Sequence, residues 1–530
     1  SAMIVSSSSR NDASSSSAPA GVGINYEWHR CCSCFETLLV KNEDRHSRPR
    51  TMHKLWDEFS GGTLGSQPLF ELFRLILPHL DTVRPQYRLK QKGLANMYVS
   101  ILAISESSED AQTLLNWKKP SSGFQRNEQG NFPEVVHSVI ETRMKKPKDL
   151  PKRLTIGELN AALDKLAEVQ STDEKKAVLD DLTKKTTARE QRWILRVILK
   201  DMQIGMKEDS IFRELHPDAK ELYASVCDLR STCQQCVDPS FRLNDITICL
   251  FKPMKPRLAH RANSWMDVHK NLSKKGEYGA EYKLDGERLV LHFLRNGLDD
   301  GGDRAEWYSR NSHNATANYA ECMAPVLKRC LKADVRECIV DGEMMVWNKR
   351  TGDYETFGSN RTLADWKKRE EEGLQPCYVV FDVLWINGKD VMKEPLRDRR
   401  EKLSKLVEWE DHSIELSECL TVRPNNGPNA DTSRQTSQNH NEEVMMCLDR
   451  AMARGYEGVM FKSLESAYAP GARDNEWIKL KPDYVGDMRD DLDLIILAGY
   501  YGDGKRGGAI SHFLLGVAAP SDARAVHGKN

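Results

Sequence analysis

The spacing of apolar residues changes near residue 250, and this change constrains the fold more than any other feature. From about Thr51 to Arg242, apolar residues recur at three and four, which is the period of an amphipathic helix. From about Phe251 to Tyr484, short runs rich in β-branched and aromatic residues alternate with Gly, Asn and charged loops. The sequence therefore predicts an all-helical region followed by a mixed α/β region with antiparallel sheets.

Length and local composition divide the chain further. At 530 residues it is too long for one hydrophobic core, so we expect two to four domains. Ser1 to about Asn25 is rich in Ser and Ala with almost no apolar content, which predicts a disordered tail. After Asp493, two β-rich runs with Gly-rich turns predict the start of a small barrel that ends incomplete. The predicted boundaries are 1–25 for the tail, 50–250 for the helical domain, 251–486 for the mixed domain and 487–530 for the barrel.

Charge is balanced overall but clustered locally. The net charge is −1, and no apolar run is long enough to cross a bilayer. Binding to a polyanion would therefore depend on local basic patches. One patch runs from Arg143 to Arg153, where six cations face one acid. In a second, Arg192, Arg196 and Lys200 recur every four residues, which predicts a cationic helix face that contacts phosphates if the partner is a polyanion.

Lys283 is the strongest candidate for chemistry. It stands between strand-like residues and a turn, in the sequence Glu281-Tyr282-Lys283-Leu284-Asp285-Gly286-Glu287-Arg288. A lysine so placed can be a nucleophile if a bound metal or neighbouring cations depress its pKa. A solvated strand end beside a Gly turn explains the same residues, so this motif alone is only a hypothesis.

Five further motifs follow Lys283 in order, and each offers a group that nucleotidyl transfer needs. Cationic side chains bind phosphate or sugar, carboxylates bind a metal ion, and an aromatic face can stack on a base. The motifs are Ser309-Arg310-Asn311, Asp341-Gly342-Glu343, Phe381-Asp382-Val383-Leu384, Glu457-Gly458-Val459-Met460-Phe461-Lys462 and Trp477-Ile478-Lys479-Leu480-Lys481. Lys479 and Lys481 are two positions apart, so they would share one face of a strand.

This ordered set resembles the covalent nucleotidyltransferase superfamily, and more closely the ATP-dependent DNA ligases. The sequences Trp193–Met202 and Ser511–Leu514 are similar to the end-joining branch of that family, type IV. The resemblance covers roughly residues 50 to 520. It implies a multidomain α and α+β chain with a helical DNA-binding domain, an ATP-grasp-like nucleotidyltransferase (adenylation) domain and a partial OB-fold barrel.

The resemblance also implies a role for each matched residue. Lys283 would form a phosphoramidate with AMP, and Phe381 would stack on the base. The other implied roles are adenine reading by Glu281 and the backbone of Tyr282 and Leu284, ribose binding by Arg288, phosphate or sugar binding by Arg310, Mg²⁺ binding by Glu343 and Glu457, and α-phosphate binding by Lys462, Lys479 and Lys481.

The implied reaction is three in-line displacements with ATP and Mg²⁺. Lys283 takes AMP from ATP, AMP passes to a 5′-phosphate at a break in duplex DNA, and a 3′-hydroxyl displaces it. The resemblance implies a nuclear enzyme of DNA repair by non-homologous end joining, with a coiled-coil scaffold partner. Because the sequence ends at Asn530, we expect that the partner-binding region and a final basic motif are missing and that self-adenylation is slow.

Two other functions fit the same residues. An RNA capping guanylyltransferase or RNA ligase shares the lysine chemistry, but the large helical region ahead of Lys283 disfavours it. A non-catalytic scaffold that binds DNA ends would fit a truncated chain, whereas the intact Lys283, Glu343 and Glu457 favour an enzyme.

Overall fold

The computed structural model divides into two compact units. The helical unit comprises Ser1–Ala219, Asp228–Phe241 and Asp493–Asn530, and the two-sheet unit comprises Lys220–Cys227 and Arg242–Leu492. The structure describes residues 23–40, 47–60, 66–119, 130–243, 248–299, 301–355, 370–423, 434–482, 494–502, 506 and 509–517. Nearly all of the predicted tail over 1–25 lies outside these residues. Within them, no helix is both long and apolar enough to span a membrane.

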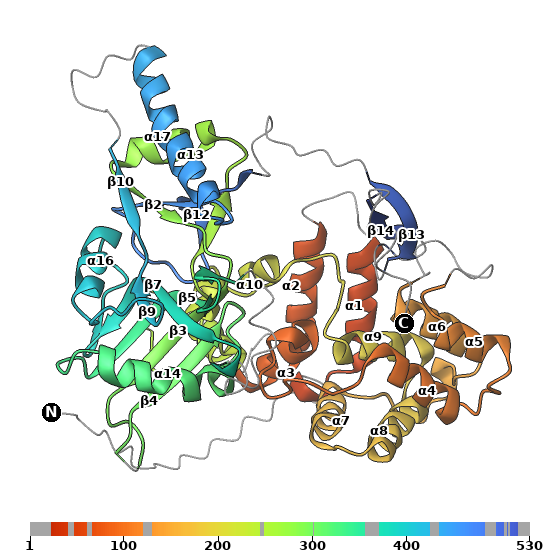
Figure 1. Cartoon of the computed structure of the whole chain (residues 1–530). Coiled ribbons are helices and arrows are strands. Elements are labelled where there is room, and N and C mark those ends of the chain that lie inside the picture. The colour runs from red at the N-terminus through yellow and green to blue at the C-terminus, as the bar shows by residue number, and fades with distance from the viewer. Residues whose placement is uncertain are drawn as a thin grey trace, which may run out of the picture. The chain divides into compact units, whose positions relative to one another are not determined.

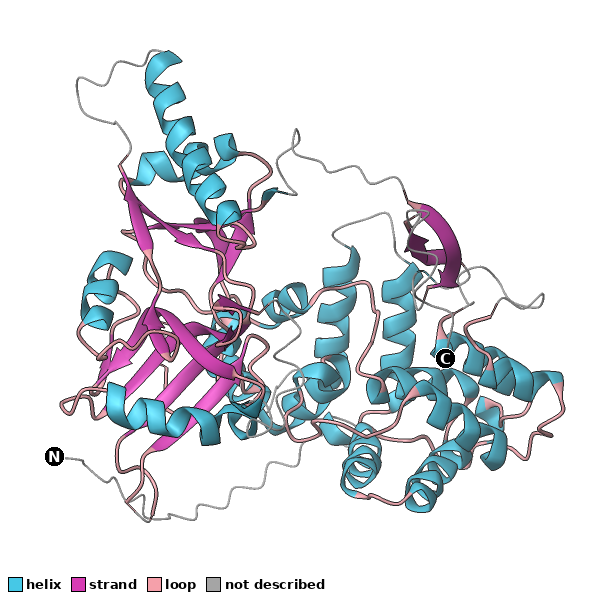
Figure 2. Ribbon diagram, in the orientation of Figure 1, coloured by secondary structure: helices cyan, strands magenta, loops and turns pink. Residues whose placement is uncertain are grey.

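The helical unit is built almost wholly of helices, as the apolar spacing predicts (Figures 1 and 2). Its α-helices are α1 (Trp28–Val40), α2 (Ser47–Ser60), α3 (Ser66–Ile76), α4 (Gln91–Ile101), α5 (Glu109–Leu115), α6 (Phe132–Ile140), α7 (Ile156–Glu168), α8 (Thr172–Lys185), α9 (Ala188–Ile198), α10 (Glu208–Leu215) and α12 (Leu229–Cys236). Short 3₁₀ turns cover Gly23–Asn25, Pro78–Leu80 and Pro147–Asp149.

Local signals explain where these helices begin. A capping box begins α7, because the Thr155 hydroxyl accepts the Glu158 N–H at 3.2 Å while the Glu158 carboxylate accepts the Thr155 N–H. The first long helix, α1, starts well before the predicted boundary at residue 50. Its buried face includes Trp28 and Phe35, which sequence analysis left outside the helical domain.

The two-sheet unit contains two separate sheets with helices around them. The strands are β1 (Leu258–Arg261), β2 (Tyr278–Tyr282), β3 (Glu287–Leu294), β4 (Arg304–Ser309), β5 (Glu337–Asn348), β6 (Asp353–Tyr354), β7 (Leu374–Ile386), β8 (Lys389–Asp390), β9 (Ile414–Leu416), β10 (Cys419–Val422), β11 (Val459–Ser463) and β12 (Arg473–Leu480). The helices are α11 (Ala219–Val226, of which all but Ala219 belongs to this unit), α13 (Trp265–Leu272), α14 (Thr316–Cys330), α16 (Leu396–Ser404) and α17 (Arg434–Ala453), with a 3₁₀ turn at Ser273–Lys275.

The two sheets differ in size and in their strand order. The smaller sheet has the order β1-β12-β11-β2-β10, in which only β1 and β12 pair in parallel. The larger sheet has the order β4-β3-β5-β7-β8, with β6 beside β5 and β9 parallel to β7. The antiparallel pairing confirms the mixed α+β architecture.

Alternation along the strands gives each sheet two distinct faces. On β3, Leu289, Leu291 and Phe293 pack with residues of α14, which lies against the larger sheet (Figure 1). Val290 points the other way, into a cluster that also contains Trp477 of β12. The outer face of the smaller sheet, in turn, packs on α13 and α17. The inner faces of the two sheets therefore share one apolar cluster.

The described part of the chain after residue 493 forms a hairpin. Strand β13 (Ile495–Tyr501) pairs antiparallel with β14 (Ile510–Gly516). These strands correspond to the two predicted for the start of a barrel, at Leu494–Tyr500 and His512–Ala519. The barrel itself stays a prediction.

His292 on β3 makes stability depend on pH. Its side chain is fully buried, its Nδ1 accepts the Phe251 N–H at 3.0 Å, and burial lowers the pKa of His292 from 6.5 to about 3. Below pH 6.5 the unfolded chain therefore binds a proton that the folded chain does not, so the free energy of unfolding decreases as the pH is lowered. Taken alone, His292 lowers the free energy of unfolding by about 2 kcal/mol between pH 7.5 and pH 5. In urea unfolding, the free energy of unfolding of His292→Gln should fall by about 2 kcal/mol less than that of the wild type between pH 7.5 and pH 5. An equal dependence on pH in both proteins would contradict a buried neutral His292.

Candidate functional site

A pocket of about 130 Å³ lies within the two-sheet unit, lined by residues of both sheets. Ten of its lining residues are ones that sequence analysis singles out: Glu281, Tyr282, Lys283, Leu284, Arg288, Arg310, Glu343, Phe381, Lys462 and Lys479. The other five are Leu258, Ala259, Ser417, Met460 and Trp477. The fold thus brings together predicted residues that lie up to 198 positions apart, from Glu281 to Lys479.

The alternation of the smaller sheet explains why these side chains meet. On β12, Ile478 and Leu480 enter the outer core, so Trp477 and Lys479 face the opposite way and line the pocket. On β11 and β2 the same rule sends Phe461 and Ala280 outward and Lys462 and Glu281 into the pocket. The polar residues of three neighbouring strands therefore converge on one face.

Lys283 is held by main-chain and side-chain contacts with one segment. Its N–H donates to the Gly458 carbonyl at 2.8 Å, and its own carbonyl accepts the Glu457 N–H at 3.2 Å. The Glu457 carboxylate also forms ion pairs with the ammonium groups of Lys283 and Lys481. Glu457 and Lys481 are thus adjacent to the pocket through Lys283, although neither lines it.

Glu281 is a buried carboxylate between two cations. It accepts from Lys462 at 2.6 Å and from Arg400 at 3.0 Å, and the Ser417 hydroxyl donates to it at 3.3 Å. Because Glu281 and Lys462 are each at most 3% exposed, these contacts offset the cost of burying both charges. The pairing fixes the side-chain orientation of Glu281 at the pocket wall.

Two aromatic rings support Lys462. Its ammonium nitrogen lies 4.2 Å from the centre of the Phe381 ring and 4.3 Å from that of Trp477. The two rings meet edge to face, with centroids 6.3 Å apart. Cation–π attraction adds to the ion pair with Glu281, so Lys462 is fixed by contacts on several sides.

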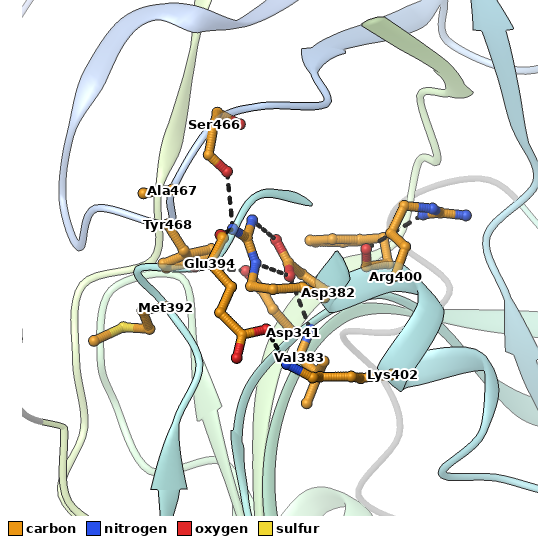
Figure 3. A network of polar contacts seen from close by, with 12 residues as sticks. Asp341, Asp382, Val383, Met392, Glu394, Arg400, Lys402, Ser466, Ala467 and Tyr468 are labelled. Atoms are coloured by element: carbon orange, nitrogen blue, oxygen red, sulfur yellow. Dashed lines mark hydrogen bonds and ion pairs between the residues drawn. The ribbon is translucent and has the colours of Figure 1, made fainter. Parts of the chain in front are cut away.

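Arg288 is fixed by a second buried acid, Asp341 on β5. Its guanidinium donates to both carboxylate oxygens, at 3.1 and 2.7 Å, and to the Arg257 carbonyl at 2.7 Å. The Tyr468 hydroxyl donates to the same carboxylate at 2.6 Å, and Figure 3 shows Tyr468 beside Asp341. This two-pronged geometry holds the guanidinium in one plane at the pocket wall.

The pocket combines excess positive charge with one poorly neutralised carboxyl group. Burial, together with the nearby charges of Lys283 and Arg310, lowers the pKa of Lys479. Burial raises the pKa of Glu343 to about 7, although Arg288 and Lys283 oppose the shift. Such a site suits an anion that arrives with a compensating cation.

The two carboxylates predicted to bind Mg²⁺ differ in their surroundings. Glu343 lines the pocket and has a raised pKa, which a divalent cation would relieve. Glu457 already neutralises two ammonium groups. Among the described residues, no group of three or more His, Cys, Asp or Glu side chains could hold a metal ion. Magnesium held by one or two carboxylates and substrate phosphates does not need such a group, so Glu343 fits the ion.

The cations predicted to form one face of α9 have partners within the helical unit. Arg196 is only 2% exposed and pairs with Glu134 at 2.5 Å, while Arg192 pairs with Glu36 at 2.5 Å and with Glu134 at 3.0 Å. The Lys200 ammonium donates to the Arg84 carbonyl at 2.7 Å. Arg192 and Arg196 connect α9 with α1 and α6, and Lys200, just after α9, holds a loop. A contact of Arg192, Arg196 or Lys200 with DNA stays a prediction.

Sequence analysis did not single out several residues that shape the pocket. Arg400 and Ser417 hold Glu281, and Tyr468 holds Asp341. The residue Trp477 lies inside a quoted motif but was given no role of its own. A signal for Arg400 existed only in the Arg399-Arg400 pair on α16, which is ordinary for a charged helix.

Gly458 provides a test of how strictly the lysine is positioned. Its φ is +148°, and a Cβ at this position would overlap the Leu480 carbonyl oxygen. We expect that Gly458→Ala lowers the free energy of unfolding by about 2–4 kcal/mol, because strain and a backbone clash add together. Gly455 is the matched control, since its φ is +74° but nothing lies within 4 Å, so Gly455→Ala should cost about 1 kcal/mol. Equal losses in urea unfolding would refute the close approach.

Comparison with known proteins identifies the family. The ATP dependent DNA ligase domain model matches residues 256–481, and the DNA ligase N terminus model matches residues 27–216. DNA ligase 4 of Homo sapiens is 36% identical over 459 residues, which are 85% of this chain and 46% of the human protein. DNA ligase 4 of Arabidopsis thaliana is 36% identical over 463 residues, which are 86% of this chain and 36% of the plant protein.

A solved structure supports the same fold. The protein titled Pmar-Lig_Pre. has a TM-score of 0.51 and 16% identity, and the match covers 91% of this chain and 84% of the other. The chain spans less than half the length of the two curated relatives. The two family models nevertheless cover most of both units. The chain therefore belongs to the ATP-dependent DNA ligase family, and its sequence is similar to the DNA ligase 4 members of that family.

Proposed function

We propose that the chain joins breaks in duplex DNA through an adenylyl group carried on Lys283. The observation that carries the proposal is the position of Lys283 in a pocket with Arg310, Lys462 and Lys479. These cations suit the negative charge that gathers on a phosphate during transfer. Membership of the ligase family supplies the reaction class.

The first step is an exchange of one phosphorus bond for another. The neutral amine of Lys283 attacks the α-phosphorus of ATP, a P–N bond forms, and the P–O bond to pyrophosphate breaks. The proton lost from the amine passes to a nearby base. The Glu457 carboxylate, paired with Lys283, is in place for that transfer. In two further displacements a DNA 5′-phosphate takes the AMP, and a 3′-hydroxyl then attacks that phosphate and releases AMP.

Nucleotide recognition follows from the fixed groups of the pocket. Glu281 would accept a hydrogen bond from the adenine amino group, with the backbone of Tyr282 and Leu284 along the base edge, and Phe381 would offer its ring to the base. Arg288, whose plane is set by Asp341, would hold the ribose. Lys462, Lys479 and Lys481 would bind the α-phosphate.

Magnesium would bind at Glu343. Glu457 would become a second ligand only if its carboxylate released the ammonium groups of Lys283 and Lys481. When bound, the ion withdraws charge from the phosphate oxygens. Relief of the raised pKa of Glu343 by the ion is the physical support for this assignment.

The biological role is proposed from the DNA ligase 4 relatives. We infer a nuclear role in double-strand break repair by non-homologous end joining, with a coiled-coil scaffold partner. The helical unit, which matches the DNA ligase N terminus model, would bind the duplex. Its basic segment Arg143–Arg153 remains a candidate for phosphate contact, although Arg143 pairs with Asp110 and Lys152 with Glu158.

The two alternative functions have less support. A capping guanylyltransferase or RNA ligase would share the Lys283 chemistry, but both units match DNA ligase models. A non-catalytic scaffold would not need an assembled pocket with a lysine, two positioned acids and converging cations. We therefore place DNA ligation first.

Mass spectrometry of the chain after incubation with ATP and Mg²⁺ tests the first step. We expect one adenylyl group on Lys283 and a loss of more than about a thousandfold in Lys283→Arg, because a guanidinium is not a nucleophile at neutral pH. Arginine keeps the positive charge beside Glu457, so this variant separates nucleophilicity from charge.

Sealing of a pre-adenylated nick tests the last step separately. This step needs no nucleophilic lysine, so Lys283→Arg should retain measurable sealing. If the wild-type chain neither acquires a label nor seals such a nick, the proposal is wrong. A label that appears with GTP in preference to ATP would favour the capping alternative.

A further inference from the structure

Two adjacent arginines of α16 serve different parts of the two-sheet unit. Arg399 is fully buried and donates to both oxygens of Asp382, at 2.8 and 2.9 Å, and to the carbonyls of Glu394 and Ser466. Figure 3 shows this network with Arg400 beside it. Arg399 therefore connects α16 with β7 and with the loop after β11, away from the pocket lining.

Arg400 instead bridges three groups of the pocket wall. One terminal nitrogen donates to Glu281 Oε1 at 3.0 Å and to the Phe381 carbonyl at 3.3 Å, and the other donates to the Ser417 carbonyl at 2.6 Å. Glu281, Phe381 and Ser417 all line the pocket, and they belong to β2, to β7 and to the segment before β10. One planar guanidinium thus fixes three separate segments relative to one another.

The contacts of Glu281 show where an incoming ligand can bind it. An ionised carboxylate offers about four acceptor positions, two on each oxygen. Among the described contacts, Oε2 accepts from Lys462 and Ser417, whereas Oε1 accepts from Arg400. The acceptor position that these contacts leave open is therefore on Oε1, the oxygen that Arg400 orients.

We propose that Arg400 is a positioning residue that determines which base the pocket accepts. This inference rests on the proposed function, in which Glu281 reads the base. An ionised carboxylate carries acceptors only, and Arg400 holds one of them, Oε1, in a fixed direction at the pocket wall. Adenine carries an amino donor at its 6-position, whereas guanine carries a carbonyl acceptor there. The fixed acceptor therefore favours ATP and opposes GTP.

Removal of the guanidinium should weaken this discrimination without stopping the chemistry. In Arg400→Met, Lys462 still pairs with Glu281, but Oε1 loses its orienting donor and the three segments lose their common contact. We expect that the preference for ATP over GTP falls by about tenfold or more, the effect of one charge-assisted hydrogen bond.

The matched control is Arg397→Met on the same helix. The Arg397 side chain is 46% exposed and pairs with Glu465. This variant makes the same chemical change without touching the pocket, so its ATP preference should equal that of the wild type. The conservative variant Arg400→Lys retains the charge and can reach one acceptor, so it should fall between wild type and Arg400→Met. It also provides a folded variant if Arg400→Met is unstable.

The experiment measures the dissociation constants of ATP and GTP for the full chain by calorimetry, with Lys283 labelling by each nucleotide as a second readout. A fall in ATP preference in both Arg400 variants, with Arg397→Met unchanged, supports the inference. A wild-type preference for ATP that persists in both Arg400 variants overturns it. A wild-type chain that binds neither nucleotide overturns the proposed function itself, and the two failures are therefore distinguishable.

Discussion

The pocket depends on the register of three hydrogen-bonded strands, β2, β11 and β12. Glu281 lies opposite Met460, which in turn lies opposite Lys479, while Lys462 lies opposite Trp477. A slip of one residue would exchange the two faces of a strand, so the charged side chains would enter the core against α13 and α17. The apolar face fixes the register, and the register fixes the chemistry of the opposite face.

Buried ion pairs then fix the positions of the side chains that these strands bring together. Three acids at most 3% exposed each have a cation: Glu281 with Lys462, Asp341 with Arg288, and Asp382 with Arg399. Removing one partner of such a pair typically costs about 3–5 kcal/mol, because a charge is left without compensation. Two of the pairs end at the pocket, so the stability of the unit and the orientation of its binding groups depend on the same contacts.

The order and spacing of short motifs predicted much of the site, and periodicity predicted much of the fold. Helical spacing before residue 250 and strand spacing after it correspond to the two units. Lys479 lines the pocket, and Lys481, just after β12, pairs with Glu457. Motif order works because each motif ends a strand or lies along it, where alternation determines which side chains converge.

Other features could not be read from local sequence. A spacing of four places Arg192 and Arg196 on one face of α9, but it does not show that Glu36 and Glu134 approach that face from distant helices. The same limit applies to Arg400. Its partner Glu281 lies 119 residues away in the sequence, and its partner Phe381 lies 19 residues away. Such contacts depend on tertiary packing, which propensity and periodicity do not encode.

All fifteen residues that line the pocket belong to the two-sheet unit. The proposed nucleophile Lys283, its counter-ion Glu457 and the proposed base-reading Glu281 therefore belong to one compact body. Under the proposed function, the first step would draw all of these groups from that body, before any nucleic acid is engaged. None of the described lining residues comes from the helical unit, so selection for substrate capture can act on that unit without replacing a residue of the pocket lining.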